Sequence, residues 1–290
     1  MNVTVLGAGR LGKPMAERLQ AVGCSVTLYN RTLQKIAGLS PAGIFITDQP
    51  EIAICRSDCV ILMLADAPAI RDVLLTGPAR SELRGRTVIQ MGTIGPSESQ
   101  AIEAEIQAVG GHYLEAPVLG SIAEARAGKL VVMVGATQEQ FLRWKDLLRS
   151  FSLEPRLIGP VGRAAALKLV LNHFIAVEMA AFALSLGVIQ SRGISVDTFM
   201  EVLRESTLYT PMFDKNLPRL LIRDYSSPNF STRHMFKDVN LFLEEASRVG
   251  LDTSSLGGMP DLLLRTIERG LGDGDYSALY ETVNPPGSDG

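Results

Sequence analysis

The chain has 290 residues, of which 46% are hydrophobic and 20% are charged, and its formal net charge is −3. This length predicts two domains, and the composition excludes an intrinsically disordered chain. The small acidic excess gives no support to a general affinity for nucleic acid or for an anionic membrane, since both select basic proteins.

The first part of the chain alternates between short apolar runs and helical segments. The apolar runs lie at residues 3–6, 25–29, 59–64, 87–90, 113–115 and 130–134. Continuous apolar runs separated by helices are typical of parallel strands that are covered on both faces. We therefore predict a doubly wound α/β domain of the Rossmann type over residues 1–162.

Residues 163–290 show helical patterning with few strand signals, which predicts an all-α second domain. Residues 163–190 form one continuous helical pattern, and shorter patterns follow at 196–205, 213–222, 234–249 and 260–269. The long segment is apolar but contains Lys168, and a central lysine costs about 3 kcal/mol in a membrane span. We predict a buried helix that joins the two domains, and we expect the last residues, 284–290, to fray.

A glycine-rich loop follows the first predicted strand and opens the first predicted helix. Its residues are Gly7, Ala8, Gly9, Arg10, Leu11 and Gly12, in the pattern G-x-G-x-x-G. The first glycine permits the tight turn, the second allows a pyrophosphate to approach the backbone, and the third allows close helix–strand packing. In this context the loop predicts a dinucleotide site, with the helix N-terminus facing the phosphates.

The residues after the second strand predict which dinucleotide is bound. An Asp or Glu here would bind the ribose 2′-hydroxyl of NAD, whereas this chain has Asn30, Arg31 and Thr32. An arginine flanked by neutral polar side chains suits a 2′-phosphate, because the guanidinium offers a charge-assisted hydrogen bond. We expect NADP(H) as the cofactor, although an ordinary surface arginine in a turn is the alternative.

Taken together, these motifs resemble the β-hydroxyacid dehydrogenase family, which includes the 3-hydroxyisobutyrate dehydrogenases. The resemblance spans essentially the whole chain and is strongest to the glyoxylate and succinic semialdehyde reductases. Beyond the glycine loop it rests on residues 30–32, 63–66, 93, 115–121, 159–172, 237–238 and 270–277.

The family resemblance implies that Lys168 and Asn172 are the catalytic residues. Their i,i+4 spacing places both on one face of the long helix. Hydride delivery to a carbonyl leaves an alkoxide, which needs a proton donor and nearby positive charge. An ammonium beside an amide meets both needs. Without the resemblance, a lysine whose stem merely covers apolar surface would be the simpler interpretation.

The resemblance also assigns further site residues. It implies that the nicotinamide and ribose end of the cofactor contacts Met63, Leu64, Ala65 and Thr93, with Lys237 and Asp238 near the cofactor. It implies that the substrate contacts Leu119, Gly120, Ser121 and Phe230. Family members usually carry a serine at the position of Leu119, so this chain has lost one polar contact to the substrate. The Ser121 hydroxyl and the Gly120 and Ser121 N–H groups remain as candidates to hold a carboxylate.

These observations predict an NADPH-dependent reductase of a small carbonyl acid, glyoxylate and succinic semialdehyde being the first candidates. An NAD-dependent 3-hydroxyacid dehydrogenase working oxidatively is the close alternative, against which Arg31 argues. An imine reductase or a non-catalytic dinucleotide-binding scaffold is disfavoured by Lys168. A phosphogluconate dehydrogenase would need a longer helical region.

Cysteine usage and the start of the chain bear on compartment and assembly. Cys24, Cys55 and Cys59 are too few and too odd in number for a disulfide framework, and no metal-ligand cluster surrounds them. We therefore expect no metal. No basic segment precedes the first strand, so we also expect no secretory signal and a cytoplasmic protein. The long apolar helix predicts a homodimer or homotetramer.

Overall fold

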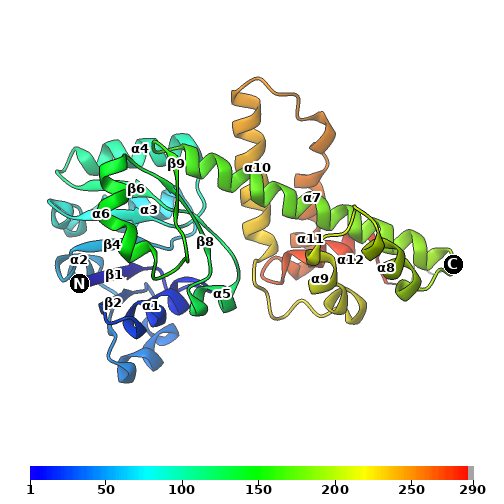
Figure 1. Ribbon diagram of the computed structural model, residues 1–290, viewed down its shortest axis with the longest axis horizontal. Coiled ribbons are helices and arrows are strands. Elements are labelled where there is room, and N and C mark those ends of the chain that lie inside the picture. Colours follow the sequence, from blue (N-terminus) through cyan, green and yellow to red (C-terminus); the bar gives the residue numbers. More distant parts are fainter. Residues whose placement is uncertain (287–290) are drawn as a thin grey trace. The chain divides into compact units, whose positions relative to one another are not determined.

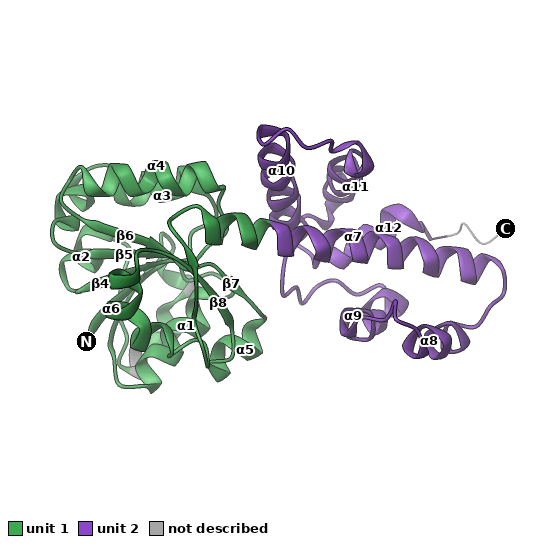
Figure 2. Ribbon diagram, turned by 45° about the horizontal axis from the view of Figure 1, so that its top comes forward, with its two compact units in different colours: residues 1–169 green, residues 170–290 purple. Residues whose placement is uncertain are grey.

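The computed structural model describes residues 1–286 and divides into two compact units, Met1–Leu169 and Val170–Gly290 (Figure 2). The division falls inside helix α7 (Arg163–Ser191), whereas the predicted domain boundary falls at its first residue. The first turn of α7 belongs with unit 1 because the backbone N–H groups of Ala164 and Ala165 donate to the Glu115 carboxylate.

Unit 1 is built on one sheet with the strand order β3-β2-β1-β4-β5-β6-β8-β7, and β9 pairs with β8 (Figure 1). The strands are β1 (Asn2–Leu6), β2 (Ser25–Tyr29), β3 (Phe45–Thr47), β4 (Cys59–Leu62), β5 (Thr87–Gln90), β6 (His112–Glu115), β7 (Val118–Leu119), β8 (Val131–Gly135) and β9 (Arg156–Gly159). Strands β1 to β6 pair in parallel. The order 3-2-1-4-5-6 is that of a Rossmann domain, which confirms the predicted fold class.

Helices cover both faces of this sheet, as the apolar runs predict. Along β4, the alternate residues Cys59 and Ile61 join one hydrophobic core, and Val60 and Leu62 join the other. The first core also takes apolar residues from α1 (Gly12–Ala21), α5 (Ile122–Ala127) and α6 (Gln138–Leu148). The second takes them from α2 (Pro50–Cys55), α3 (Ala67–Leu74) and α4 (Pro96–Gln107).

The sheet departs from the sequence expectation at its far edge. Strand β8 runs antiparallel to both β6 and β7. Only residues 120–130, which include the six-residue α5, connect β7 to β8, whereas a parallel connection needs a crossover of about a dozen residues or more. Three short strands, β3, β7 and β9, were not predicted. They have three, two and four residues, and only one residue of β3 and none of β9 is fully buried, so their sequence signals are weaker than those of the central strands.

Among the residues that the structure describes, unit 2 is built of helices, as predicted, and the last helix ends at Val283. Around the later turns of α7 it places α8 (Val196–Glu205), α9 (Pro211–Ile222), α10 (Thr232–Arg248), α11 (Met259–Thr266) and α12 (Tyr280–Val283). Their core includes Phe182, whose ring stacks on Phe213 at 4.5 Å. Helix α11 ends earlier than predicted, because a π-helical turn follows and Gly270 takes a positive φ of 85°. The sequence predicts that residues 284–290 fray. The backbone N–H of Asn284 is bonded to the carbonyl of Tyr280, and residues 287–290 lie outside the described part of the chain.

Helix α7 is less buried than the sequence predicts. Only 39% of its most apolar window is buried, and Phe174, Leu184 and Val188 are each more than half exposed. By length and composition it could cross a membrane, a test that core helices of soluble proteins also pass. Part of its apolar surface is therefore not covered by the described residues of this chain.

Candidate active site

The glycine loop between β1 and α1 is packed so tightly that two of its positions admit only glycine. Gly7 has a φ of +104°, and a Cβ there would lie 2.4 Å from the Met63 carbonyl oxygen. A Cβ on Gly12 would lie 1.9 Å from the Gly7 carbonyl oxygen. A Cβ on Gly9, by contrast, would meet no atom within 4 Å. The loop is thus pressed onto the end of β4 and leaves open space over Gly9, where a ligand can approach the backbone.

The start of α1 has the properties of an anion site. Its N-cap residue, Leu11, makes no side-chain capping bond, and its first turn contains no acidic residue. The helix therefore leaves N–H groups and partial positive charge directed at the loop. Arg10, immediately before the cap, is exposed. Loop and helix start together fit the pyrophosphate of a dinucleotide.

The structure brings the predicted 2′-phosphate residues next to this loop. The Ala8 N–H donates to Asn30 Oδ1 at 3.3 Å, and Asn30 Nδ2 donates to the Thr32 carbonyl at 2.8 Å. The Asn30 amide is thus engaged in holding the loop, a role that the sequence did not indicate. Arg31 and Thr32 are exposed. The guanidinium of Arg31 is therefore accessible to a ligand.

The other predicted cofactor residues follow β4 and β5 at the same edge of the sheet. Met63, Leu64 and Ala65 come directly after β4, and Thr93 lies three residues beyond β5. Because the carboxyl ends of parallel strands share one edge, these residues lie at the same edge as the glycine loop. The Met63 N–H also donates to the carbonyl of Leu6, the last residue of β1 before the loop, at 2.8 Å.

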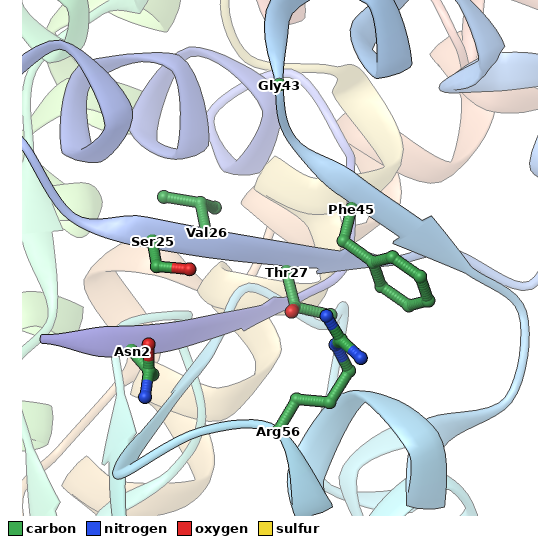
Figure 3. Close-up of a pocket in the computed structure, with 7 residues that line it drawn as sticks. All are labelled: Asn2, Ser25, Val26, Thr27, Gly43, Phe45 and Arg56. Atoms are coloured by element: carbon green, nitrogen blue, oxygen red, sulfur yellow. The ribbon is translucent and has the colours of Figure 1, made fainter.

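The pocket in Figure 3 lies at the opposite edge of the sheet. Its lining includes Asn2, Ser25 and Phe45, which are the first residues of β1, β2 and β3. The Arg56 guanidinium lies 4.0 Å above the Phe45 ring in a cation–π contact. This pocket is consequently separate from the carboxyl edge that holds the predicted cofactor residues.

The predicted substrate loop is held by a capping box. Leu119 ends the short strand β7, and Gly120 takes a φ of +143° before Ser121 caps α5. The N–H of Ser121 donates to Glu124 Oε2 at 2.6 Å, and the Ser121 hydroxyl donates to the same oxygen. Two of the three donors expected to hold a substrate carboxylate, the Ser121 N–H and hydroxyl, are thus already bonded to a carboxylate of the chain. A substrate can use them only by displacing Glu124.

Lys168 is buried on α7, with 7% of its surface exposed, and it belongs to unit 1. A lysine is rarely buried to this degree in a domain interior, because removing an ammonium from water is costly. Asn172 follows one helical turn later and is 3% exposed. Burial of both side chains on one helix face distinguishes them from solvated surface residues.

Within unit 2, Asn172 is bonded to a residue that the sequence assigned to the cofactor. Its Nδ2 donates to Asp238 Oδ2 at 2.6 Å, and Lys237 Nζ lies 2.7 Å from Asp238 Oδ1. Asp238 is 2% exposed. Asp238, paired with Lys237, therefore orients the Asn172 amide. Asn172 and Asp238 are 66 positions apart, so no local motif reveals this contact.

Phe230, predicted to contact substrate, belongs to unit 2. It is half-buried just before α10, and its ring centroid is 6.0 Å from that of Tyr276. The three cysteines are free. Within residues 1–286, no three His, Cys, Asp or Glu side chains gather in a way that could hold a metal ion.

Comparison with known proteins gives matches along both halves of the chain. Residues 2–159 match the family model of the NAD binding domain of 6-phosphogluconate dehydrogenase. Residues 162–283 match the model described as NAD-binding of NADP-dependent 3-hydroxyisobutyrate dehydrogenase. Together the two models account for almost the entire chain.

Individual relatives agree with these models. The chain is 31% identical to glyoxylate/succinic semialdehyde reductase 1 of Arabidopsis thaliana, with 98% of each protein covered. It is 26% identical to the 2-hydroxy-3-oxopropionate reductase of Escherichia coli, covering 98% of this chain and 97% of the relative. A crystal structure of 3-hydroxyisobutyrate dehydrogenase from Salmonella typhimurium shares the fold, with a TM-score of 0.88 at 22% identity over 97% and 99% of the two chains. The chain belongs to the 3-hydroxyisobutyrate dehydrogenase family, whose members are NAD(P)-dependent hydroxyacid dehydrogenases and reductases.

Proposed function

We propose that this protein is an NADPH-dependent reductase that converts small carbonyl acids to hydroxyacids. The observation that carries this proposal is the buried Lys168, one turn before the buried Asn172 on α7. The names of two relatives point to aldehydes that carry a carboxylate, namely glyoxylate, succinic semialdehyde and 2-hydroxy-3-oxopropionate. Substrates of the same class suit this chain.

The roles of the residues follow from the charge that develops during reduction. When bound, the nicotinamide cofactor supplies the hydride that reduces the carbonyl carbon. Lys168 Nζ then gives one proton to the oxygen that gains negative charge, and its positive charge stabilises that oxygen before the proton moves. Asn172, held by Asp238, keeps its amide in a fixed orientation on the same helix face.

The preference for NADPH rests on the residues after β2. No acidic side chain occupies positions 30–32, where a carboxylate would bind the ribose hydroxyls of NAD, and Arg31 is exposed beside the glycine loop. Its guanidinium can make a charge-assisted hydrogen bond to a 2′-phosphate. We keep the cytoplasmic location as a prediction from the sequence.

A substrate panel tests the proposed reaction. Oxidation of NADPH and of NADH is followed with glyoxylate, succinic semialdehyde, 2-hydroxy-3-oxopropionate and uncharged aldehydes of matched length. We expect turnover of the carboxylate-bearing aldehydes with a higher kcat/KM for NADPH than for NADH. Reaction only in the direction of hydroxyacid oxidation, with NAD, would replace the proposal by the oxidative alternative.

Leu119 is expected to set substrate preference. An apolar side chain cannot bond a substrate oxygen, and a polar group left unpaired against it loses about 1–3 kcal/mol. Leu119→Ser should therefore raise kcat/KM for glyoxylate and hydroxylated acids relative to more apolar aldehydes. The ratio of kcat/KM values across the panel measures this effect, with Val118→Ala, on the same strand, as the control. An unchanged ratio would place Leu119 outside the substrate pocket.

We further propose that the protein assembles as a homodimer or homotetramer through α7. The exposed apolar side chains Leu184 and Val188 are one turn apart on this helix, and a second copy of the chain would cover them. Light scattering should give at least twice the mass of one chain. Leu184→Glu should dissociate the assembly, whereas substitution of the exposed Lys215 should not; a monomeric wild-type protein would contradict the proposal.

A further inference from the structure

Glu115 is a buried carboxylate that the reaction above does not use. It ends β6 and is 1% exposed. The neighbouring strand β8 leaves room for it at Gly135, where an added Cβ would lie 2.3 Å from Glu115 Oε1. An ionisable side chain in such a position requires several hydrogen-bond partners.

Those partners are backbone N–H groups at the start of α7, from Gly162 just before the helix and from its first turn. Glu115 Oε1 accepts from the N–H of Gly162 at 2.8 Å, of Ala164 at 2.9 Å and of Ala165 at 3.0 Å. Helix starts leave such donors without intrahelical partners, and a short side chain next to the helix usually satisfies them. Here the acceptor comes from a strand about 50 positions earlier in the chain.

The other carboxylate oxygen is held by a second helix. Glu115 Oε2 accepts from Ser99 Oγ of α4 at 2.5 Å, and Ser99 Oγ lies 2.8 Å from the hydroxyl of Tyr113. Burial raises the pKa of Glu115, and the hydrogen bonds from Ser99 and from the α7 backbone act in the opposite direction by stabilising the charged form. The side chain is consequently fixed at both oxygens.

Two elements of the proposed site begin next to this anchor. Lys168 lies three residues after Ala165, within one helical turn, and the strand that carries Leu119 starts three residues after Glu115. We propose that Glu115 is a positioning residue. It holds the first turn of α7, and with it Lys168, in register with the predicted substrate loop, Leu119 to Ser121; this inference rests on the proposed function. It touches neither substrate nor cofactor, and it acts through the helix backbone.

A misplacement of about 1 Å can cost about a hundredfold in rate, so loss of the anchor should appear in kcat. We expect Glu115→Ala to lower kcat about tenfold while the Kd for NADPH stays within about twofold of wild type, because the glycine loop is untouched. Glu115→Gln keeps an oxygen for the three N–H groups and can donate its amide to Ser99. This variant should retain most of the kcat.

The matched control is Thr137→Ala. Thr137 caps α6 (Gln138–Leu148) in the same unit, by accepting from the Gln140 N–H at 3.2 Å, and α6 carries no proposed site residue. This substitution weakens a helix cap in unit 1 without touching α7. The kcat of the Thr137→Ala enzyme, measured well below its unfolding temperature, should therefore match that of wild type. An equal loss of kcat in Thr137→Ala and Glu115→Ala would reduce the role of Glu115 to general stability and overturn the inference.

Amide hydrogen exchange gives a readout that does not depend on activity. Residues 162–169 should exchange faster in Glu115→Ala than in wild type and Glu115→Gln, with other helices of unit 1 unchanged. If Glu115→Ala does not fold, Gly135→Ala displaces the carboxylate without removing it and should reproduce both effects. Unchanged kcat and exchange in the variant that folds would overturn the inference. Wild-type inactivity on the whole panel would instead refute the proposed function, while exchange still reports whether Glu115 holds the turn before Lys168.

Discussion

Replacing Lys168 by alanine is expected to lower kcat for aldehyde reduction by about 10²- to 10⁴-fold, the usual contribution of a general acid. Loss of the positive charge that stabilises the developing alkoxide acts in the same direction. Binding of NADPH should stay close to normal, because the glycine loop and Arg31 are the groups proposed to hold the phosphates. Steady-state kinetics and a fluorescence titration with NADPH measure the two effects separately.

Two further variants separate chemistry from stability in this experiment. Lys168→Met fills nearly the same volume without charge, so it should be as inactive as the alanine variant yet at least as stable as wild type, since it removes a buried ammonium. Lys215→Ala removes an exposed lysine from α9 and should change nothing. A Lys168→Met enzyme that keeps a tenth of the wild-type kcat would show that another group supplies the proton.

Replacing Arg31 by alanine is expected to weaken NADPH binding by about tenfold to a hundredfold, because a hydrogen bond to a charged group contributes about 1.5–3 kcal/mol. The affinity for NADH, which lacks the 2′-phosphate, should change little. The measurement is therefore the Kd for NADH divided by the Kd for NADPH, and this ratio should fall toward one in the variant. Rising ionic strength should reduce the wild-type preference for NADPH, since Arg31 is exposed and its charge is screened.

Arg56→Ala is the matched control for this experiment. It removes an exposed arginine from the opposite edge of the same sheet, where Arg56 stacks on Phe45 (Figure 3). Both Kd values should remain at the wild-type level. Equal losses for NADPH and NADH in Arg31→Ala would contradict the assignment of Arg31 to the 2′-phosphate.

Local patterns were sufficient to predict the class of fold. The run from Cys59 to Leu62 is apolar at every position, and the structure buries it on both faces. The glycines at positions 7 and 12 indicate a loop whose packing leaves no room for a Cβ at either position. The glycine pattern that predicts this loop spans only a few neighbouring residues. Such features are visible because strand pattern, turn chemistry and helix period are each encoded within a short stretch of chain.

Tertiary structure alone decided how the candidate site residues are held. Asn172 is bonded to Asp238 and the start of α7 to Glu115, over separations of 66 and about 50 positions. Neither pairing has a local signal, since each depends on which elements meet when the core forms. The direction of β8 was likewise set by the short connection through α5. A motif names the chemical groups that are present, but packing of distant segments determines the partners that orient them.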